Sequence, residues 1–86
     1  KIGFVESPET GIKMDIITEQ PGIQLYTGNF LDGSLESKEK KQYEKHSGFC
    51  LETQHFPNSP NQKEYPSVIL NKGEVYNTET IYKFSY

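Results

Sequence analysis

Short apolar runs, each closed by proline, glycine or asparagine, constrain the fold of this chain most strongly. In residues 12–19, "IKMDIITE", the apolar side chains of Ile12, Met14 and Ile16 recur at every second position. A period of two is that of a β-strand, in which successive side chains point to opposite faces. Similar or shorter apolar runs mark the other candidate strands, which are 23–30, 47–54, 67–70 and 74–86. Because helical periodicity is essentially absent, we predict an all-β chain.

Turn signals separate these candidate strands. At 20–22 the proline suits the first central position of a turn, and we expect Gly22 to supply a positive φ at the second. Residues 32–33, Asp-Gly, mark the exit from the second strand, and residues 71–73, Asn-Lys-Gly, predict a tight turn. Residues 56–66 contain three prolines and predict an irregular connection.

The last candidate strand carries a row of aromatic and threonine side chains at period two. The members of this row are Tyr76, Thr78, Thr80, Tyr82, Phe84 and Tyr86. We interpret the row as a packing face of a sheet rather than as a platform for a ligand.

Composition limits how much core these strands can build alone. The chain has 86 residues, of which 33% are hydrophobic, and its single cysteine, Cys50, cannot form an internal disulfide. A short chain with few apolar side chains buries little apolar area, and the free energy gained by that burial hardly offsets the conformational entropy lost on folding. We therefore expect the strands to complete a larger sheet, and a start at Lys1 without methionine fits a fragment of one domain.

Charge and hydropathy bear on partners and on location. The net charge is −3 and the positive side chains are all lysine, so we expect no nucleic-acid partner. The longest apolar run is too short to span a bilayer, so we expect no membrane partner. A lone cysteine and the absence of an N-x-S/T site favour a reducing, cytoplasmic location.

Residues 34–45, "SLESKEKKQYEK", are dense in charge and poor in large apolar side chains. The pattern predicts a solvated surface loop with at most one helical turn. A lysine site for a phosphorylated ligand is the alternative interpretation. The interleaved glutamates cancel the positive field of the lysines, so we favour the surface loop.

One carboxylate lies inside the candidate strand 47–54. Glu52 follows Phe49, Cys50 and Leu51, and an acidic side chain among apolar neighbours costs free energy unless it is paired or used. From the residues alone, an outward-facing surface glutamate and a functional glutamate both remain open.

A histidine precedes Glu52 and another follows it, but their spacing does not indicate a metal site. His46-x₃-Cys50-x₄-His55 matches no common zinc spacing. We predict structural roles for both histidines. We predict that Cys50 is buried and inert, since the sequence guarantees no cationic group that would activate its thiol.

Three blocks at compatible spacing carry a resemblance that covers the chain from about Thr10 onward. They are "PGIQLYTGNFLDG" (21–33), "HSGFCLETQHFPNSPNQ" (46–62) and "YPSVILNKGEVYNTETIYKFS" (65–85). In that order they resemble the C-terminal part of the aldose 1-epimerase (mutarotase) family. The resemblance implies a large antiparallel β-sandwich with a sugar cleft across one sheet. Residues 1–86 would form the C-terminal portion of this mutarotase-like domain, and its remaining strands would be their partner.

The resemblance also implies an activity and two site residues. The family interconverts the α and β anomers of free aldohexoses such as galactose and glucose without a metal or organic cofactor. Its general base is the glutamate of the "LETQ" block, which falls on Glu52, and its sugar-binding glutamine of the "PG-x-Q" block falls on Gln24. The general-acid histidine belongs to upstream blocks that this chain does not contain, so we expect the isolated chain to be inactive.

Two alternatives to a mutarotase remain open at this stage. A hexose-phosphate epimerase of the same fold would need cationic groups for the phosphate, and the lack of arginine here disfavours it. A non-catalytic sugar-binding β-sandwich module is the second alternative.

Overall fold

The computed structural model describes residues 1–86 and contains five β-strands and one 3₁₀ helix. The elements are β1 (Gly3–Glu6), β2 (Lys13–Thr18), β3 (Gly22–Tyr26), β4 (Cys50–Gln54), η1 (Ser59–Asn61) and β5 (Thr80–Ser85). There is no α-helix, so the prediction of an all-β, antiparallel fold class is confirmed. The chain divides into two compact units. The first unit is Lys1–Gly22 with Thr53–Tyr86, and the second is Ile23–Glu52.

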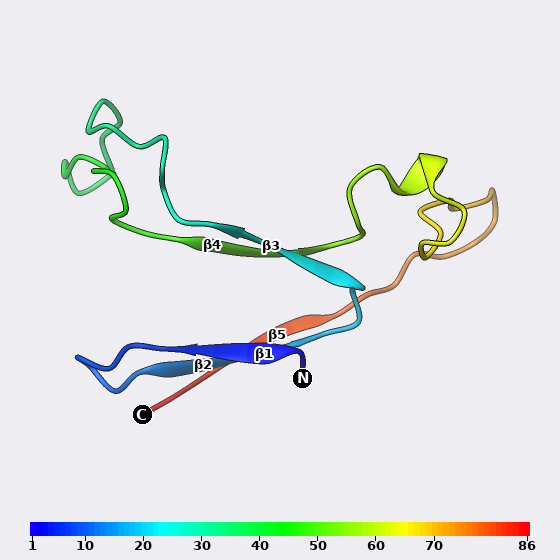
Figure 1. Ribbon diagram of the computed structural model, residues 1–86, viewed down its shortest axis with the longest axis horizontal. Coiled ribbons are helices and arrows are strands. Elements are labelled where there is room, and N and C mark those ends of the chain that lie inside the picture. The colour runs from blue at the N-terminus through cyan, green and yellow to red at the C-terminus, as the bar shows by residue number, and fades with distance from the viewer. The chain divides into compact units, whose positions relative to one another are not determined.

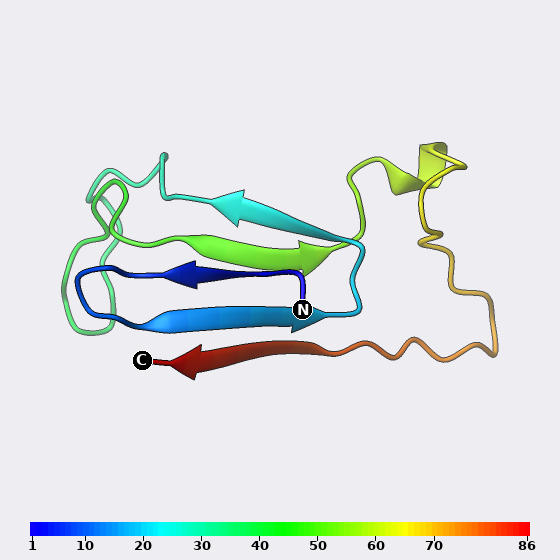
Figure 2. The ribbon, with the colours of Figure 1, turned by 60° about the horizontal axis from the view of Figure 1, so that its bottom comes forward.

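The first unit is built on a three-stranded antiparallel sheet in the order β1-β2-β5. The strands are labelled in Figure 1, and Figure 2 shows their order. β2 is the central strand because it pairs along both edges. Its Ile16 is 4% exposed and is the one buried hydrophobic residue of the chain. In β5, Tyr82 lies opposite Ile16 and Phe84 lies opposite Met14. The aromatic side chains of the predicted packing row are nevertheless exposed, so the row is not covered by other residues of this chain.

β1 is a strand that the sequence pattern did not predict. It forms because β2 offers it a free edge, and Phe4 of β1 lies opposite Asp15. The ammonium groups of Lys1 and Lys13 lie 5.5 and 4.5 Å from the centre of the Phe4 ring. Both groups also pair with the Asp15 carboxylate, at 2.9 and 3.5 Å. The hydrogen bond from Lys1 is the main cause that lowers the pKa of Asp15.

Side-chain hydroxyls join β2, β4 and β5. Thr18 lies directly opposite Thr80, and their Oγ1 atoms are 2.9 Å apart. Thr80 Oγ1 is also 2.9 Å from Oγ1 of Thr53 in β4. Cross-strand hydroxyl pairs of this kind contribute roughly 0.2–1 kcal/mol to the stability of a sheet.

The turn at 20–22 differs from its predicted form. Gly22 does not adopt a positive φ, so that prediction is wrong; the chain bends over 19–21 and Gly22 begins β3. The glycine is needed for a different reason, because a Cβ atom at Gly22 would lie 3.0 Å from two ring atoms of Phe56. Gly22 therefore permits a close approach between its backbone and an aromatic ring.

Two other turn and loop predictions are confirmed and one is wrong: residues 32–33 bend but do not mark the exit from the strand predicted over 23–30, because β3 already ends at Tyr26. Gly33 has a φ of +83° and Gly73 a φ of +90°. The turn at 71–73 is closed by a hydrogen bond of 3.0 Å, which the backbone N–H of Glu74 donates to the carbonyl oxygen of Asn71. The connection 56–66 is irregular apart from η1.

Two strand predictions near the C-terminus are wrong in part. Residues 67–70 form no strand, and the strand expected over 74–86 is reduced to β5. Mostly side chains hold the segment before β5. Gln20 Nε2 donates to Tyr76 OH at 2.6 Å and to Thr78 Oγ1 at 3.0 Å, and one backbone hydrogen bond of 3.3 Å runs from the N–H of Glu19 to the carbonyl oxygen of Glu79. The apolar and alternating patterns were present, but the chain supplies no neighbouring strand that pairs with these residues.

The second unit, Ile23–Glu52, contains most of β3, the first residues of β4 and the charged segment between them. β3 and β4 form a two-stranded sheet, and their arrows run in opposite directions in Figure 2. In the charged segment, an isolated bridge pairs Glu36 with Gln42, and all residues of 34–45 are exposed except the half-buried Ser37.

Candidate active site

Glu52 lies in the middle of β4, as the strand prediction for this segment required, and its side chain is exposed. Its neighbours Leu51 and Thr53 are half-buried and, by strand alternation, belong to the opposite face. Phe49, one of its apolar neighbours in the sequence, is itself 57% exposed. The Glu52 carboxylate makes no hydrogen bond or ion pair with another residue of the chain. It is therefore free to accept a proton or a hydrogen bond from a ligand.

Gln24 lies in β3, the strand that neighbours β4 in the two-stranded sheet. Its side chain is exposed, and its Nε2 donates one long hydrogen bond of 3.4 Å to the carbonyl oxygen of Leu25. The structure thus places the two predicted site residues on adjacent strands of one sheet. A strand fixes the direction of a side chain better than a loop does.

The prediction that Cys50 is buried is wrong. Cys50 is exposed and free, and it belongs by alternation to the same face of β4 as Glu52. The apolar neighbours in the sequence suggested burial, but Leu51 is directed to the half-buried face while Cys50 and Phe49 remain exposed.

His46 has a local structural contact, in line with its predicted role. Its Nδ1 lies 2.8 Å from the carbonyl oxygen of Thr27, and its backbone N–H donates to the carbonyl oxygen of Gly28 at 3.3 Å. These contacts tie the start of the segment before β4 to the end of β3. His46 also has a positive φ of 63°. His55 follows β4 and is half-buried.

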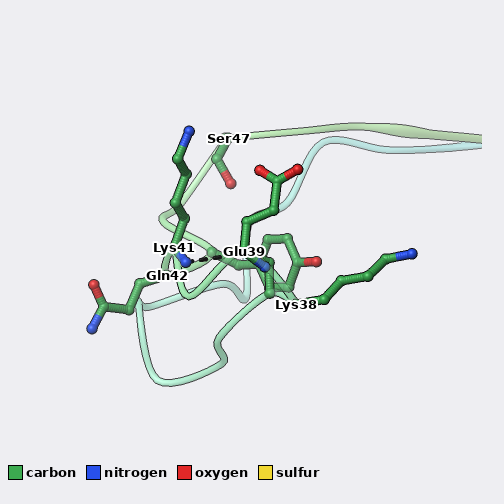
Figure 3. Close-up of a pocket in the computed structure, with 7 residues that line it drawn as sticks. Lys38, Glu39, Lys41, Gln42 and Ser47 are labelled. Atoms are coloured by element: carbon green, nitrogen blue, oxygen red, sulfur yellow. Dashed lines mark hydrogen bonds between the residues drawn. The ribbon is translucent and has the colours of Figure 1, made fainter.

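A hollow of about 390 Å³ lies in the charged segment (Figure 3). Ser37 organises its wall, because its Oγ accepts hydrogen bonds from the backbone N–H groups of Glu39 and Lys41 at 3.3 and 3.2 Å. The ammonium groups of Lys38 and Lys41 extend in different directions in Figure 3. They do not converge on one point, which disfavours a site for a phosphate group here.

The structure contains no group of three or more His, Cys, Asp or Glu side chains placed to hold a metal ion. No helix in it has both the length and the apolar character needed to cross a membrane.

The hydroxyl contact between Thr53 and Thr80 was not predicted from the sequence. These residues are 27 positions apart, and threonines are common in strands. The register between β2 and β5 brings Thr80 opposite Thr18. Thr53 reaches Thr80 from β4. The sequence offered one indication of this contact: Thr53 directly follows Glu52 in the candidate strand, so the two side chains lie on opposite faces.

Comparison with known proteins places the chain among sugar epimerases. The sequence profile of the aldose 1-epimerase family matches residues 1–83. Galactose mutarotase from Rattus norvegicus is 51% identical over 81 residues, which cover 94% of this chain and 24% of that protein. Galactose mutarotase from Sus scrofa is 55% identical over 76 residues, which cover 88% of this chain and 22% of that protein.

A bacterial relative shows the same coverage. Aldose 1-epimerase from Escherichia coli (strain K12) is 35% identical over 82 residues, which cover 93% of this chain and 23% of that protein. The chain thus spans about a quarter of the length of the curated relatives it matches. Since the profile match extends over nearly all of its residues, the chain belongs to the aldose 1-epimerase family.

Proposed function

We propose that this chain is the C-terminal portion of an aldose 1-epimerase domain and that Glu52 is its general base. The observation that carries the proposal is an uncommitted carboxylate on β4, whose neighbouring strand β3 carries Gln24, in a chain of this family. A base must be free to receive a proton, and Glu52 has no partner within the chain that would compete for its oxygen atoms.

The proposed reaction opens and closes the pyranose ring. Glu52 removes the proton of the C1 hydroxyl while a general acid protonates the ring oxygen, so that the C1–O5 bond breaks and a free aldehyde forms. The C1–C2 bond turns, and the ring closes on the other face of the aldehyde. Each positioned acid or base contributes roughly 10²- to 10⁴-fold to such a step. We assign the acid to residues outside 1–86.

Gln24 is proposed to bind the sugar. Its amide offers both donors and an acceptor, which suits it to hydroxyl groups that can play either part. The 3.4 Å bond to Leu25 is long, so a sugar hydroxyl can replace it at little cost.

The proposed substrates are free aldohexoses such as galactose and glucose, and no cofactor takes part in the proposed steps. This choice is supported by relatives that carry the names galactose mutarotase and aldose 1-epimerase. We also propose a cytoplasmic location, supported by the free thiol of the exposed Cys50.

The proposal is tested in a chimera in which this chain replaces the matching part of the Rattus norvegicus galactose mutarotase, hereafter the mutarotase chimera. Glu52→Gln keeps the shape of the side chain but cannot take a proton. We expect kcat for mutarotation to fall by at least about 10²-fold with little change in KM.

Glu6→Gln is the matched control, because Glu6 is also an exposed strand glutamate but lies in β1. Its kcat should stay within about twofold of the unsubstituted chimera, since removal of a surface charge changes little. A folded Glu52→Gln chimera with near-normal kcat would refute the assignment of the base.

A further inference from the structure

The register between β3 and β4 follows from two backbone contacts, one near each end of the pair. A Cβ atom at Gly22 would lie 3.4 Å from the carbonyl oxygen of Gln54, and both residues belong to the first unit. A Cβ atom at Gly28 would lie 3.2 Å from the carbonyl oxygen of Gly48, and both residues belong to the second unit. The two strands run in opposite directions (Figure 2), and Gly28 follows Gly22 by as many residues as Gly48 precedes Gln54. The two contacts therefore agree on a single antiparallel register.

This register makes Gln24 and Glu52 a directly opposed pair. It is reached from the first contact by two residues forward along β3 and two residues back along β4. Two more residues in the same directions lead to Tyr26 and Cys50, and these two residues line one hollow of about 410 Å³, as opposed residues should. Directly opposed residues of antiparallel strands point to the same face, with Cβ atoms about 4.5–5.5 Å apart. Gln24 and Glu52 thus lie side by side on one face, both within the second unit.

The two side chains can reach neighbouring atoms of one ligand. Glutamine and glutamate side chains have the same length, so the amide of Gln24 and the carboxylate of Glu52 extend equally far from the sheet. The Glu52 carboxylate has no partner within the chain, and Gln24 Nε2 donates one long hydrogen bond of 3.4 Å to the carbonyl oxygen of Leu25. A sugar placed with its C1 hydroxyl at Glu52 therefore presents the atoms next to C1 to Gln24.

We propose that Gln24 binds the C2 hydroxyl of the aldohexose and so determines specificity at that carbon. This inference rests on the proposed role of Glu52 as the general base at the C1 hydroxyl. In the pyranose ring C1 has two neighbours, C2 and O5. O5 receives its proton from the general acid, which we assign to residues outside 1–86, so the C2 hydroxyl is left for the group beside Glu52. The Gln24 amide can both donate to and accept from this hydroxyl.

The kinetic test compares three sugars in the mutarotase chimera: galactose, 2-deoxygalactose and 6-deoxygalactose. Gln24→Ala should lower kcat/KM for galactose by about three- to tenfold, mainly through KM. For 2-deoxygalactose the same substitution should change kcat/KM by less than about twofold, because this sugar lacks the hydroxyl that Gln24 binds. 6-Deoxygalactose is the matched control, since it lacks a hydroxyl that is not attached next to C1. Its loss on Gln24→Ala should equal the loss for galactose.

Three outcomes of this comparison would overturn the inference. One is an equal loss of kcat/KM for galactose and 2-deoxygalactose in a folded Gln24→Ala chimera. Another is a loss that disappears with 6-deoxygalactose and persists with 2-deoxygalactose. The third is a Gln24→Ala chimera that keeps its full kcat/KM with galactose.

The register itself is tested without kinetics, by a disulfide. Tyr26→Cys in the chimera places a thiol opposite the native Cys50, at a Cα separation of about 4.5–5.5 Å, which a disulfide can span. Mild oxidation should link these two positions, as detected by mass spectrometry of the digested protein. Leu25→Cys is the matched control, because Leu25 lies in the same strand but by alternation on the other face, and it should form no link to Cys50. A folded Tyr26→Cys chimera without the link, or a link formed by Leu25→Cys instead, would overturn the register and the inference with it.

The inference and the proposed function can fail separately. Should Tyr26→Cys fail to fold, the comparison of the three sugars decides the question. Should Glu52→Gln leave kcat unchanged, the proposed function fails as a whole. Loss of activity in Glu52→Gln, together with an equal effect of Gln24→Ala on galactose and 2-deoxygalactose, leaves the proposed function intact and refutes only the assignment of Gln24 to the C2 hydroxyl.

Discussion

Glu52 and Gln24 are both exposed on adjacent strands, yet the roles we propose for them predict different kinetics. A base acts on the transition state, whereas a sugar-binding amide contributes to the ground state and the transition state alike. The two side chains can therefore be distinguished by which kinetic constant responds to substitution.

Gln24→Ala in the mutarotase chimera should raise KM more than it lowers kcat. A hydrogen bond of this kind is worth about 0.5–1.5 kcal/mol, so the total loss in kcat/KM should be about tenfold or less. Steady-state mutarotation kinetics with galactose measure both constants. A fall in kcat with an unchanged KM would argue against the binding role.

At the residue scale, the sequence predicted which residues lie on strands better than it predicted which side chains are buried. Glu52 and Gln24 fall on strands, as expected, and their assignment came from blocks that resemble a known family. The burial of Cys50 could not be predicted, because an apolar run in the sequence does not say which face of a strand is covered. The contact of Thr80 with Thr53 depends on strand register, which the sequence does not state.

At the scale of the elements, the sequence pattern predicted β2 and predicted β3, β4 and β5 at greater length than they have, while pairing decided where these strands begin and end. β2 alternates clearly and occupies the centre of its sheet. β1 has too few residues to show a period and becomes a strand because it pairs with β2. Residues 67–70 have a strand-like composition but no partner, and they stay irregular.

Gly22 is the first residue of β3, and a substitution there tests how closely its backbone packs against Phe56. An alanine Cβ at Gly22 would lie 3.0 Å from the Phe56 ring and 3.4 Å from the carbonyl oxygen of Gln54. We expect Gly22→Ala to destabilise the mutarotase chimera by about 1–3 kcal/mol, the usual cost of overpacking.

Gly3→Ala is the matched control for this substitution. Gly3 also begins a strand and has no positive φ, but a Cβ there would meet nothing within 4 Å. Gly3→Ala should leave stability unchanged or raise it by up to about 1 kcal/mol. Thermal unfolding followed by circular dichroism measures both variants, and equal midpoints for the two would contradict the close contact with Phe56.

At the scale of the whole molecule, the apolar surface is large for so short a chain. Ile16 is the one buried hydrophobic residue, while Phe30, Val75 and Tyr86 are among many large hydrophobic side chains that are exposed. The outer edges of β1 and β5 also have no neighbour within the chain. Such a chain gains little hydrophobic free energy on folding.

The purified 86-residue chain should therefore be at most marginally stable alone. We expect a broad thermal transition of small amplitude in far-ultraviolet circular dichroism and binding of a hydrophobic dye at 25 °C. The same segment in the mutarotase chimera should unfold cooperatively, because we propose that the remaining strands of the domain cover its apolar surface. A sharp, cooperative transition of the isolated monomer would contradict this expectation.

The central claim is that this chain supplies the base of a mutarotase and depends on the rest of a family domain for the acid. It is tested most directly by polarimetry on freshly dissolved α-D-galactose with three samples: the isolated chain, the Rattus norvegicus relative without its matching part, and the mutarotase chimera. We predict that neither piece alone accelerates mutarotation above buffer and that the chimera does. Catalysis by the isolated chain, or a folded chimera with no activity, would contradict the claim.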